Sequence, residues 1–508
     1  MVQLTNAQVL AAATPDRLIN IISAPGSGKT TIAAERYGYL RYHAGDLRGV
    51  LGLTFNRAAA AELRRRIDLR WGTNCIRPAH RVITFDHLHV NLLTHFLREG
   101  KVTWPNKITT PDVRDDYRGV KGFRFLQAGN YVRVADLDNR RVVVSQSRKV
   151  TKPESGIGNV DNHRAVLSAG TVSHSDVRSI LRSAMRQKDL RRFASDWLSE
   201  NYRALVIDEA YDGDGLDLCV AYLAAEAGLS VTLIGDPWQA LYKWRGAEPE
   251  VVRKLLDSTS DPFAKYEQPK SFRFVGEQMP QLAANLRSGI GGTLPHTDSS
   301  EVDVALARNW VQLWDVGDNI LPLAFRTVNN ATDAAMNLLL DVVTRARLGT
   351  TSYGREGAIM KLGLDRENFQ AKQDQALMPI VESLRAGIGE AQVLDNLRET
   401  IKRLGVRKPS RLSDDEEAKV RTQLTRLAAR LRRTKLIPGL TVFQAKGREW
   451  ERVGVVLSST QRATLASGLR ALEEEHCIIY VAVTRAKRFC GLLSDTSEHE
   501  VDQPQLDM

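Results

Sequence analysis

The sequence predicts an α/β fold with two parallel sheets, each in a domain that is interrupted by an inserted subdomain. Three observations lead to this prediction. Short apolar runs alternate with helical stretches in the first part of the chain, the same alternation returns after about residue 320, and a long stretch without it interrupts each series. Repeated strand–turn–helix units imply parallel strands, with the ligand at their carboxyl ends.

The first series consists of short β-branched runs that each end at a polar cluster. Its expected strands are Leu18–Ile22, Gly49–Leu53, Val82–Thr84, Ala204–Ile207 and Val231–Ile234, and its expected helices include Thr31–Leu40 and Ala58–Ile67. A basic stretch from about Thr94 to Asn201 interrupts the series. There Tyr131–Ala135 and Arg141–Ser145 flank the polar segment 136–139, which predicts a β-hairpin.

The second series predicts a sheet of the same kind. Its expected strands are Ile320–Phe325, Leu440–Phe443, Val453–Leu457 and Ile478–Val483. We therefore expect a first α/β domain at 1–93 plus 201–268, an inserted subdomain with a basic hairpin at 94–200, a second α/β domain at 269–348 plus 438–493, a mostly helical basic insertion at 349–437 and an acidic tail at 494–508.

The composition excludes several classes of protein. The chain has 508 residues, of which 43% are hydrophobic and 26% are charged, which is typical of a soluble globular protein. It has no apolar run long enough to span a membrane and no basic region at Met1–Ala13 that would suggest a secretory signal. Its four cysteines lie far apart, which excludes a disulfide framework and fits a reducing, cytoplasmic setting without a membrane partner.

Basic residues exceed acidic ones by 71 to 60, which favours a polyanionic partner. The excess is largest between Arg398 and Lys435, where 13 lysines or arginines face five acids. Within that segment Ser413 and Glu416 predict a capping box, and apolar residues then recur at helical spacing at Val420, Leu424, Leu427 and Leu431. A helix with a solvated basic face explains this pattern, and so does a nucleic-acid contact.

The sharpest local signal is Ser23-Ala24-Pro25-Gly26-Ser27-Gly28-Lys29-Thr30, which follows an expected strand and opens a helix. This context is that of a phosphate-binding P-loop, although the strict pattern has glycine where this chain has Ser23. Gly26 and Gly28 let backbone N–H groups approach a phosphate, Lys29 can reach the β- and γ-phosphates, and the Thr30 hydroxyl suits Mg²⁺. A turn that binds nothing is the alternative.

A P-loop enzyme also needs carboxylates for the metal and for the attacking water. The apolar strand Ala204–Ile207 ends in Asp208 and Glu209. We expect Asp208 to hold Mg²⁺ and Glu209 to polarise the nucleophilic water.

Eight ordered segments then resemble the motifs of superfamily-1 helicases of the UvrD, Rep and PcrA type. They are Leu4-Thr5-Asn6-Ala7-Gln8 (Q motif), the P-loop, 54–62 beginning Thr54-Phe55-Asn56-Arg57 (motif Ia) with Thr84-Phe85-Asp86-His87-Leu88 after it, Asp208-Glu209-Ala210-Tyr211-Asp212 (DExQD), 235–247 beginning Gly235-Asp236-Pro237-Trp238-Gln239 (motif III), Ser271-Phe272-Arg273 (NYRS), 441–450 beginning Thr441-Val442-Phe443-Gln444 (TxHxxKGLEF) and 480–486, which ends Thr484-Arg485-Ala486 (YVxxTRA).

The resemblance implies two RecA-like P-loop NTPase domains that bind ATP and Mg²⁺. It implies catalytic roles for Lys29, Asp208, Glu209, Gln239 as a γ-phosphate sensor, and Arg273 and Arg485 as arginine fingers. It implies nucleotide contacts from Gln8, Ala24, Pro25, Gly26, Ser27, Gly28, Lys29, Thr30, Thr31, Arg36, Phe272 and Glu449, with Thr30 and Asp208 also at the metal. It implies a strand channel formed by Phe55, Asn56, Tyr242, Trp244 and Arg245, where bases stack on aromatic rings.

Three positions depart from the family pattern. Tyr211 stands where the family has Gln, Phe443 stands where it has His, and Pro269-Lys270 precede the NYRS-like segment. We expect the first two to alter the coupling between hydrolysis and DNA. His80, His87, His89 and His95 cluster near Cys75, but their spacing fits no common zinc pattern. No HExxH, GxSxG or nuclease motif is present.

The sequence therefore predicts an ATP-driven translocase and helicase on single-stranded DNA or tailed duplex, moving 3′ to 5′ as the resembled family does. The alternative is a nucleic-acid-regulated ATPase subunit that acts with a partner nuclease in an anti-phage complex such as Gabija. A P-loop NTPase without motor activity is a third reading, which the aromatic motif III disfavours.

Overall fold

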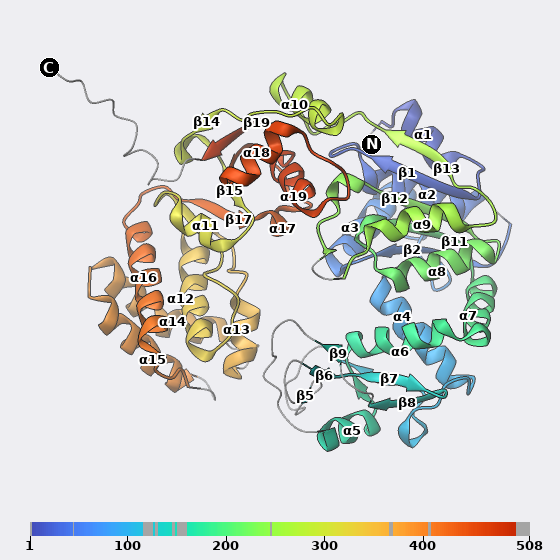
Figure 1. Cartoon of the computed structure of the whole chain (residues 1–508), viewed down its shortest axis with the longest axis horizontal. Helices are drawn as coiled ribbons and strands as arrows, with labels where there is room; N and C mark the ends of the chain where they lie inside the picture. The colour runs from blue at the N-terminus through green and yellow to red at the C-terminus, as the bar shows by residue number, and fades with distance from the viewer. Residues whose placement is uncertain are drawn as a thin grey trace. The chain divides into compact units, whose positions relative to one another are not determined.

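The computed structural model describes residues 3–43, 45–114, 125–127, 131–144, 148–149, 160–243, 246–364, 369–404 and 408–493 (Figure 1). The chain divides into two compact units, Met1–Phe272 and Arg273–Met508. Each unit contains a six-stranded sheet in which all strand pairs are parallel, which confirms the expected α/β class.

The sheet of the first unit has the order β13-β1-β12-β11-β2-β3. Its strands are β1 (Leu18–Ser23), β2 (Gly49–Thr54), β3 (Arg81–Thr84), β11 (Tyr202–Asp208), β12 (Ser230–Gly235) and β13 (Ala264–Gln268). Every residue of β2 and β11 is buried, as continuous apolar runs in the middle of a parallel sheet should be. The accompanying elements are α1 (Asn6–Ala13), α2 (Lys29–His43), α3 (Arg57–Trp71), α4 (Phe85–Arg98), η2 (Ala210–Asp212), α8 (Gly215–Glu226), η3 (Pro237–Gln239) and α9 (Pro249–Ser258).

The segment between β3 and β11 carries a further set of helices and short strands. It contains η1 (Pro105–Lys107), β4 (Asp112–Val113), β5 (Phe125–Gln127), β6 (Tyr131–Arg133), β7 (Ala135–Asp138), β8 (Arg141–Val144), β9 (Arg148–Lys149), α5 (Val160–Ser168), β10 (Thr171–Val172), α6 (His174–Arg186) and α7 (Lys188–Asn201). The hairpin is present, but its first strand is β7. The segment 136–139 was therefore wrongly expected to form the turn. The turn is Asn139–Arg140, where both residues have positive φ, as a type I′ turn requires.

The sheet of the second unit has the order β14-β19-β18-β15-β17-β16. Its strands are β14 (His296–Thr297), β15 (Val304–Ala307), β16 (Ile320–Pro322), β17 (Ile437–Thr441), β18 (Trp450–Val455) and β19 (Ala486–Leu493). Around them lie α10 (Gln278–Arg287), η5 (Ser299–Glu301), α11 (Trp310–Asp315), α12 (Ala331–Leu348), α17 (Val442–Ala445), α18 (Ser459–Ser467) and α19 (Glu474–Val483). The expected strand Ile478–Val483 was wrong, because this run forms the buried second half of helix α19.

The segment between α12 and β17, here called the insertion of the second unit, contains the helices α13 (Arg355–Leu362), α14 (Phe369–Arg385), α15 (Glu390–Leu404) and α16 (Asp414–Leu431) (Figure 1). These helices share one apolar core with α12, and Val420, Leu424, Leu427 and Leu431 of α16 all lie in it. The expected capping box is absent, because Ser413 makes no side-chain cap bond and the Glu416 carboxylate accepts from Arg326 and Lys419. The expected acidic tail 494–508 lies outside the described residues.

Candidate nucleotide and nucleic-acid sites

The P-loop leaves the carboxyl end of β1 and enters α2 at Lys29. Gly26 and Gly28 have φ of 72° and 85°, a region that glycine reaches without steric cost. A Cβ on Gly28 would lie 2.9 Å from the amide nitrogen of Gln8, so a larger residue would also collide with the Q-motif helix. The Ser27 hydroxyl is buried and has no hydrogen-bond partner among the residues that the structure describes. The local sequence thus builds a cradle with a spare donor, which fits a phosphate group.

Asp208 and Glu209 lie at the end of β11, two strands away from the P-loop strand in the same sheet. Asp208 is 3% exposed and accepts from the Glu209 N–H, and the Thr30 hydroxyl also bonds to it. Burial and the adjacent Glu209 carboxylate raise the pKa of Asp208 to about 6, against the attraction of Lys29. The Thr30 hydroxyl and the Asp208 carboxylate are hard oxygen ligands of the kind that Mg²⁺ prefers. The charge of a bound Mg²⁺ would favour the ionised form of Asp208.

Glu209 has a strained backbone. Its φ and ψ are 58° and 43°, in the left-handed region that a glutamate rarely adopts. Its peptide carbonyl accepts from the Asp212 N–H, which begins the η2 turn. This turn sets the direction in which the Glu209 side chain leaves the strand, and such strain is common at functional positions.

Tyr211 and Gln239 lie at neighbouring strand ends. The Tyr211 ring packs against Gly235 at the end of β12, where a Cβ would lie 2.7 Å from the ring. Burial of the ring raises the pKa of Tyr211 to about 12. Gln239 is 3% exposed and donates to Asp236 at 2.7 Å. Tyr211 therefore fills space beside motif III, where its large ring explains why Gly235 has no side chain.

Gln8, Thr31 and Arg66 lie on one side of the P-loop. Gln8 donates to the Ser27 carbonyl at 2.9 Å and accepts from Thr5 N–H at 2.9 Å. Arg66 of α3 donates to the Thr31 hydroxyl and, at 2.7 Å, to Glu62. Arg66 is a cation next to the loop that the sequence analysis missed. The run Arg64-Arg65-Arg66 could have drawn attention to this helix but not to the one residue that faces the loop.

Arg36 does not join this group. It is 1% exposed and donates to the carbonyls of Ala12, Thr14 and Asp16, just before β1 begins. The P-loop follows the other end of the same strand. Arg36 therefore holds α1 against the sheet, and its nucleotide contact stays a prediction.

The second unit brings together three of its expected site residues. Arg273 donates to Glu449 at 2.8 Å and to the Thr484 carbonyl at 2.7 Å. Lys487 lies 3.5 Å from Glu449 on the other side. Burial opposes ionisation of Glu449, but Arg273 and Lys487 outweigh it and lower its pKa. Arg485 is 1% exposed and donates to the carbonyls of Val481 and Arg448. Lys487 was not foreseen from the sequence.

Phe272 belongs to the first unit. Its N–H donates to the Gly26 carbonyl at 2.9 Å, and its ring is 52% exposed, with the Lys270 ammonium 5.5 Å from the ring centre. The ring is therefore available to a flat ligand beside the P-loop.

The motif Ia and following segments lie at the carboxyl ends of β2 and β3. The half-buried Phe55 ring stacks on Phe85 with centroids 5.0 Å apart. Asn56 caps α3 through a 2.8 Å bond from Ala59 N–H. Beside them a cavity of about 520 Å³ is lined by Arg57, Ala60, Arg64, Ile76, Arg77, Pro78, Arg81, Val82, Ile83, Thr84 and His87. A row of cations beside the half-buried Phe55 ring suits a nucleic-acid strand.

Other expected strand-channel residues are only partly described. Tyr242 is half-buried and its carbonyl accepts from Ala247 N–H. Trp244 and Arg245 lie outside the described residues. Phe443, at the second departure from the family, is half-buried in α17 directly after β17.

Three of the four clustered histidines, His80, His89 and His95, make contacts within the fold. His80 accepts from Val50 N–H at 3.0 Å, His89 lies 3.4 Å from Asp217, and His95 stacks on Phe193. Within the described ranges no helix is both long and apolar enough to cross a membrane.

Comparison with known proteins agrees with this geometry. The UvrD/REP helicase N-terminal domain model matches residues 4–152 and 168–260, and the UvrD-like helicase C-terminal domain model matches residues 365–490. The chain is 23% identical over 361 residues to DNA helicase II of Salmonella typhimurium and 24% identical over 361 residues to DNA helicase II of Escherichia coli, covering 65% of this chain and 45% of each relative. It is also 35% identical over 81 residues, 16% of each chain, to the Gabija protein GajB of Bacillus cereus.

The chain thus spans less than half the length of the DNA helicase II relatives. The two domain models together nevertheless match most of it, in the order in which the two α/β units follow each other. The protein belongs to the UvrD-like helicase family.

Proposed function

We propose that the protein is an ATP-dependent translocase and helicase on single-stranded DNA, which moves 3′ to 5′ and uses Mg²⁺. The main support is that one edge of one sheet carries both kinds of chemistry. The P-loop follows β1, Asp208 is the last residue of β11, and Gln239 lies shortly after β12. The stacked rings of Phe55 and Phe85 directly follow the neighbouring strands β2 and β3. Hydrolysis and strand binding can therefore communicate over short distances through the same strands.

In this proposal each residue has a separate task. The P-loop amides and Lys29 bind the phosphates, and Thr30 and Asp208 hold the metal. When bound, Mg²⁺ neutralises developing charge on the phosphates. Glu209 orients the attacking water, Gln239 senses the γ-phosphate, and Arg273 and Arg485 stabilise the transition state.

The proposal extends to movement. ATP binding closes the cleft between the two RecA-like domains and hydrolysis opens it, so that a strand held on Phe55 is moved stepwise. Non-specific stacking lets such a motor work on any sequence.

The decisive experiment measures ATP hydrolysis with and without single-stranded DNA. Glu209→Gln should still bind ATP but hydrolyse it about 100-fold or more slowly, because the water is no longer oriented. Lys29→Ala should hydrolyse no ATP, because the cation that holds the β- and γ-phosphates is lost.

The matched control is Glu200→Gln, which removes an exposed carboxylate at the end of α7. It should hydrolyse ATP at the parent rate. If Glu209→Gln hydrolysed ATP as fast as the unmodified protein, the catalytic assignment would be refuted. If DNA did not change the rate of ATP hydrolysis by the unmodified protein, the motor function would be refuted. Strand displacement on duplexes with a 3′ or a 5′ tail tests the direction.

A second function is favoured by the match to GajB. The protein would then be a nucleic-acid-regulated ATPase subunit of an anti-phage complex with a partner nuclease. Co-purification with a nuclease encoded beside its gene, together with ATP-dependent DNA cleavage by the pair, would support this role. A nuclease that cleaves identically without the protein would exclude it.

A further inference from the structure

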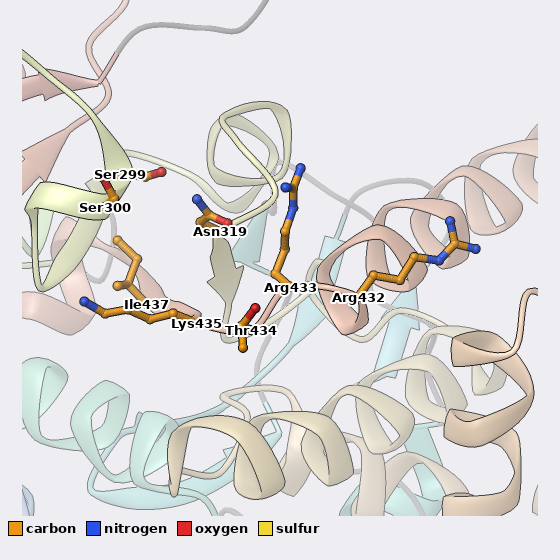
Figure 2. Close-up of a pocket in the computed structure, with 8 residues that line it drawn as sticks. All are labelled: Ser299, Ser300, Asn319, Arg432, Arg433, Thr434, Lys435 and Ile437. Carbon is orange, nitrogen blue, oxygen red and sulfur yellow. The ribbon is translucent and has the colours of Figure 1, made fainter.

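The basic end of α16 forms an open pocket on the second unit. Residues 432–435 connect α16 to β17, and together with neighbouring loops they surround a cavity of about 330 Å³ (Figure 2). Its lining residues are Ser299, Ser300, Asn319, Arg432, Arg433, Thr434, Lys435 and Ile437. Hydroxyl, amide, guanidinium and ammonium groups are all hydrogen-bond donors to anionic oxygens.

Two other arginines fix the backbone of this segment. Arg430 is 1% exposed, lies 4.6 Å over the Trp314 ring and donates to the carbonyls of Trp314, Gly317 and Ile320. Arg347 of α12 donates to the carbonyls of Leu431, Arg433 and Thr434. The segment is therefore held by buried or half-buried cations, which add to the local positive charge.

The outward cations are left largely unneutralised. Arg432, Arg433 and Lys435 are exposed. Arg433 pairs with Asp318 at 3.2 Å. In the part of the chain that the structure describes, neither Arg432 nor Lys435 forms an ion pair. Figure 2 shows the three side chains spreading in different directions, with Arg433 beside Asn319, Lys435 toward Ile437 and Arg432 away from both.

We propose that this pocket binds the phosphate backbone of a second segment of nucleic acid. Cations that spread apart match successive phosphates along a chain better than one isolated phosphate. The serine and asparagine donors suit phosphodiester oxygens, which bind proteins without regard to sequence. The choice of nucleic acid over an acidic protein rests on the proposed function.

The pocket is separate from the strand channel. It lies where β16 and β17 begin, since Asn319 precedes β16 and Ile437 opens β17. The helicase motif residue Thr441 lies at the other end of β17. A strand held here is thus a different stretch of nucleic acid from one that follows the motifs.

The test compares two double variants with the same change in charge. Arg432→Gln with Lys435→Gln removes the two unpaired cations and leaves the buried Arg430 and the Arg433–Asp318 pair intact. Lys419→Gln with Arg421→Gln is the control, because both residues are exposed on the first half of α16. Binding of a tailed duplex is followed by fluorescence anisotropy over a salt series. A polyphosphate chain and a polyglutamate peptide serve as further probes.

The pocket variant should bind the tailed duplex about tenfold more weakly at 0.1 M salt, and its salt slope should fall by between 1 and 2, since each phosphate contact contributes about 0.9. The control should match the parent, and ATP hydrolysis without DNA should be unchanged in both. Equal DNA and polyphosphate binding by the two variants would overturn the proposal. Loss of polyglutamate binding alone would instead assign the pocket to an acidic protein.

The DNA and polyphosphate measurements together distinguish failure of the proposed function from failure of the pocket proposal. If the parent binds no DNA, the proposed function fails, and the nucleic-acid assignment of the pocket fails with it. If the parent binds DNA but the pocket variant is unaffected, only the pocket proposal fails. Polyphosphate binding that is lost only in the pocket variant, without a DNA effect, would limit the site to other polyanions and overturn its nucleic-acid role.

Discussion

His80 is a buried residue whose fold role requires it to stay neutral. Its Nδ1 accepts a hydrogen bond from the Val50 N–H of β2 at 3.0 Å, and His80 is 5% exposed. Burial, together with Arg41, Arg203 and Arg77, lowers its pKa from 6.5 to about 4. A depressed histidine pKa gives stability that is present above pH 6.5 and is lost as the pH falls toward 4.

We therefore expect the free energy of unfolding to drop by about 1 to 2 kcal/mol between pH 7 and pH 5 through this residue. His80→Asn keeps an acceptor near the same place but does not titrate, so it should flatten the pH dependence. Urea unfolding at several pH values measures this. The same pH slope in both proteins would show that His80 does not cause it.

Arginines show why residue roles were only partly predictable. Arg64, Arg65 and Arg66 are consecutive in the sequence, yet Arg64 caps the Val82 carbonyl of the edge strand, Arg65 pairs with Glu62, and Arg66 reaches Thr31 beside the P-loop. Arg36 and Arg430 are buried cations that hold backbone carbonyls. Composition identifies such residues as basic but not the carbonyls that the fold places around them. The positions of the P-loop and of the Asp208–Glu209 pair at the ends of β1 and β11 were predictable, because each depends on a short apolar run followed by a polar turn.

At the scale of elements, Arg178 connects the inserted subdomain to the helix that follows the turn carrying Glu209. It lies on α6 and donates to Asp86 at 3.0 Å, to Asp214 at 2.8 Å and to Asp217 at 3.2 Å. Asp214 caps α8, the helix that follows the turn carrying Glu209. Asp217 is 2% exposed, and burial raises its pKa to about 7. The position of α6 is thus linked to the start of α8 by charges that have little contact with water.

Arg178→Gln should lower the free energy of unfolding by about 3 kcal/mol, because it leaves the buried Asp217 without its arginine partner. The turnover number for ATP should fall more than the KM changes, since the turn is displaced rather than the phosphate cradle. Arg182→Gln is the control, because Arg182 is 47% exposed and, among the described residues, bonds only Asp214. The Arg182→Gln change should lower the free energy of unfolding by less than 1 kcal/mol. Equal losses in the two variants would show that Arg178 is not the connecting residue.

Element types were predictable where the sequence pattern had one reading. The buried strand Ala204–Ile207 was expected and forms most of β11. Ile478–Val483 was expected as a strand because a short apolar β-branched run fits either state. The run instead forms part of helix α19, in which every residue from Cys477 to Val483 is buried. Residues on all faces of the helix therefore contact other parts of the protein. Only packing on all sides, which a sequence does not display, decides such a case.

At the scale of the whole molecule, the insertion of the second unit bears on the proposed motor activity. Helices α13–α16 share one core with α12, and Asp341 of α12 binds Arg345, Arg355, Gln373 and the Ser352 N–H. These contacts make the insertion a packed extension of its own unit. Most of its apolar side chains pack in this core, although Met360, Met378 and Ile388 are exposed, and the basic end of α16 is its most charged surface.

We therefore expect the purified protein to move along single strands but to separate duplexes weakly, because a small packed insertion has little surface with which to grip a duplex ahead of the motor. Displacement of streptavidin from a biotinylated single strand should be ATP-dependent, while a duplex of the same length should be opened slowly. A partner protein that holds the duplex should raise the second rate and leave the first unchanged. Processive unwinding of long blunt duplexes by the protein alone would contradict this expectation, since such activity requires a duplex grip that α13–α16 would then have to provide.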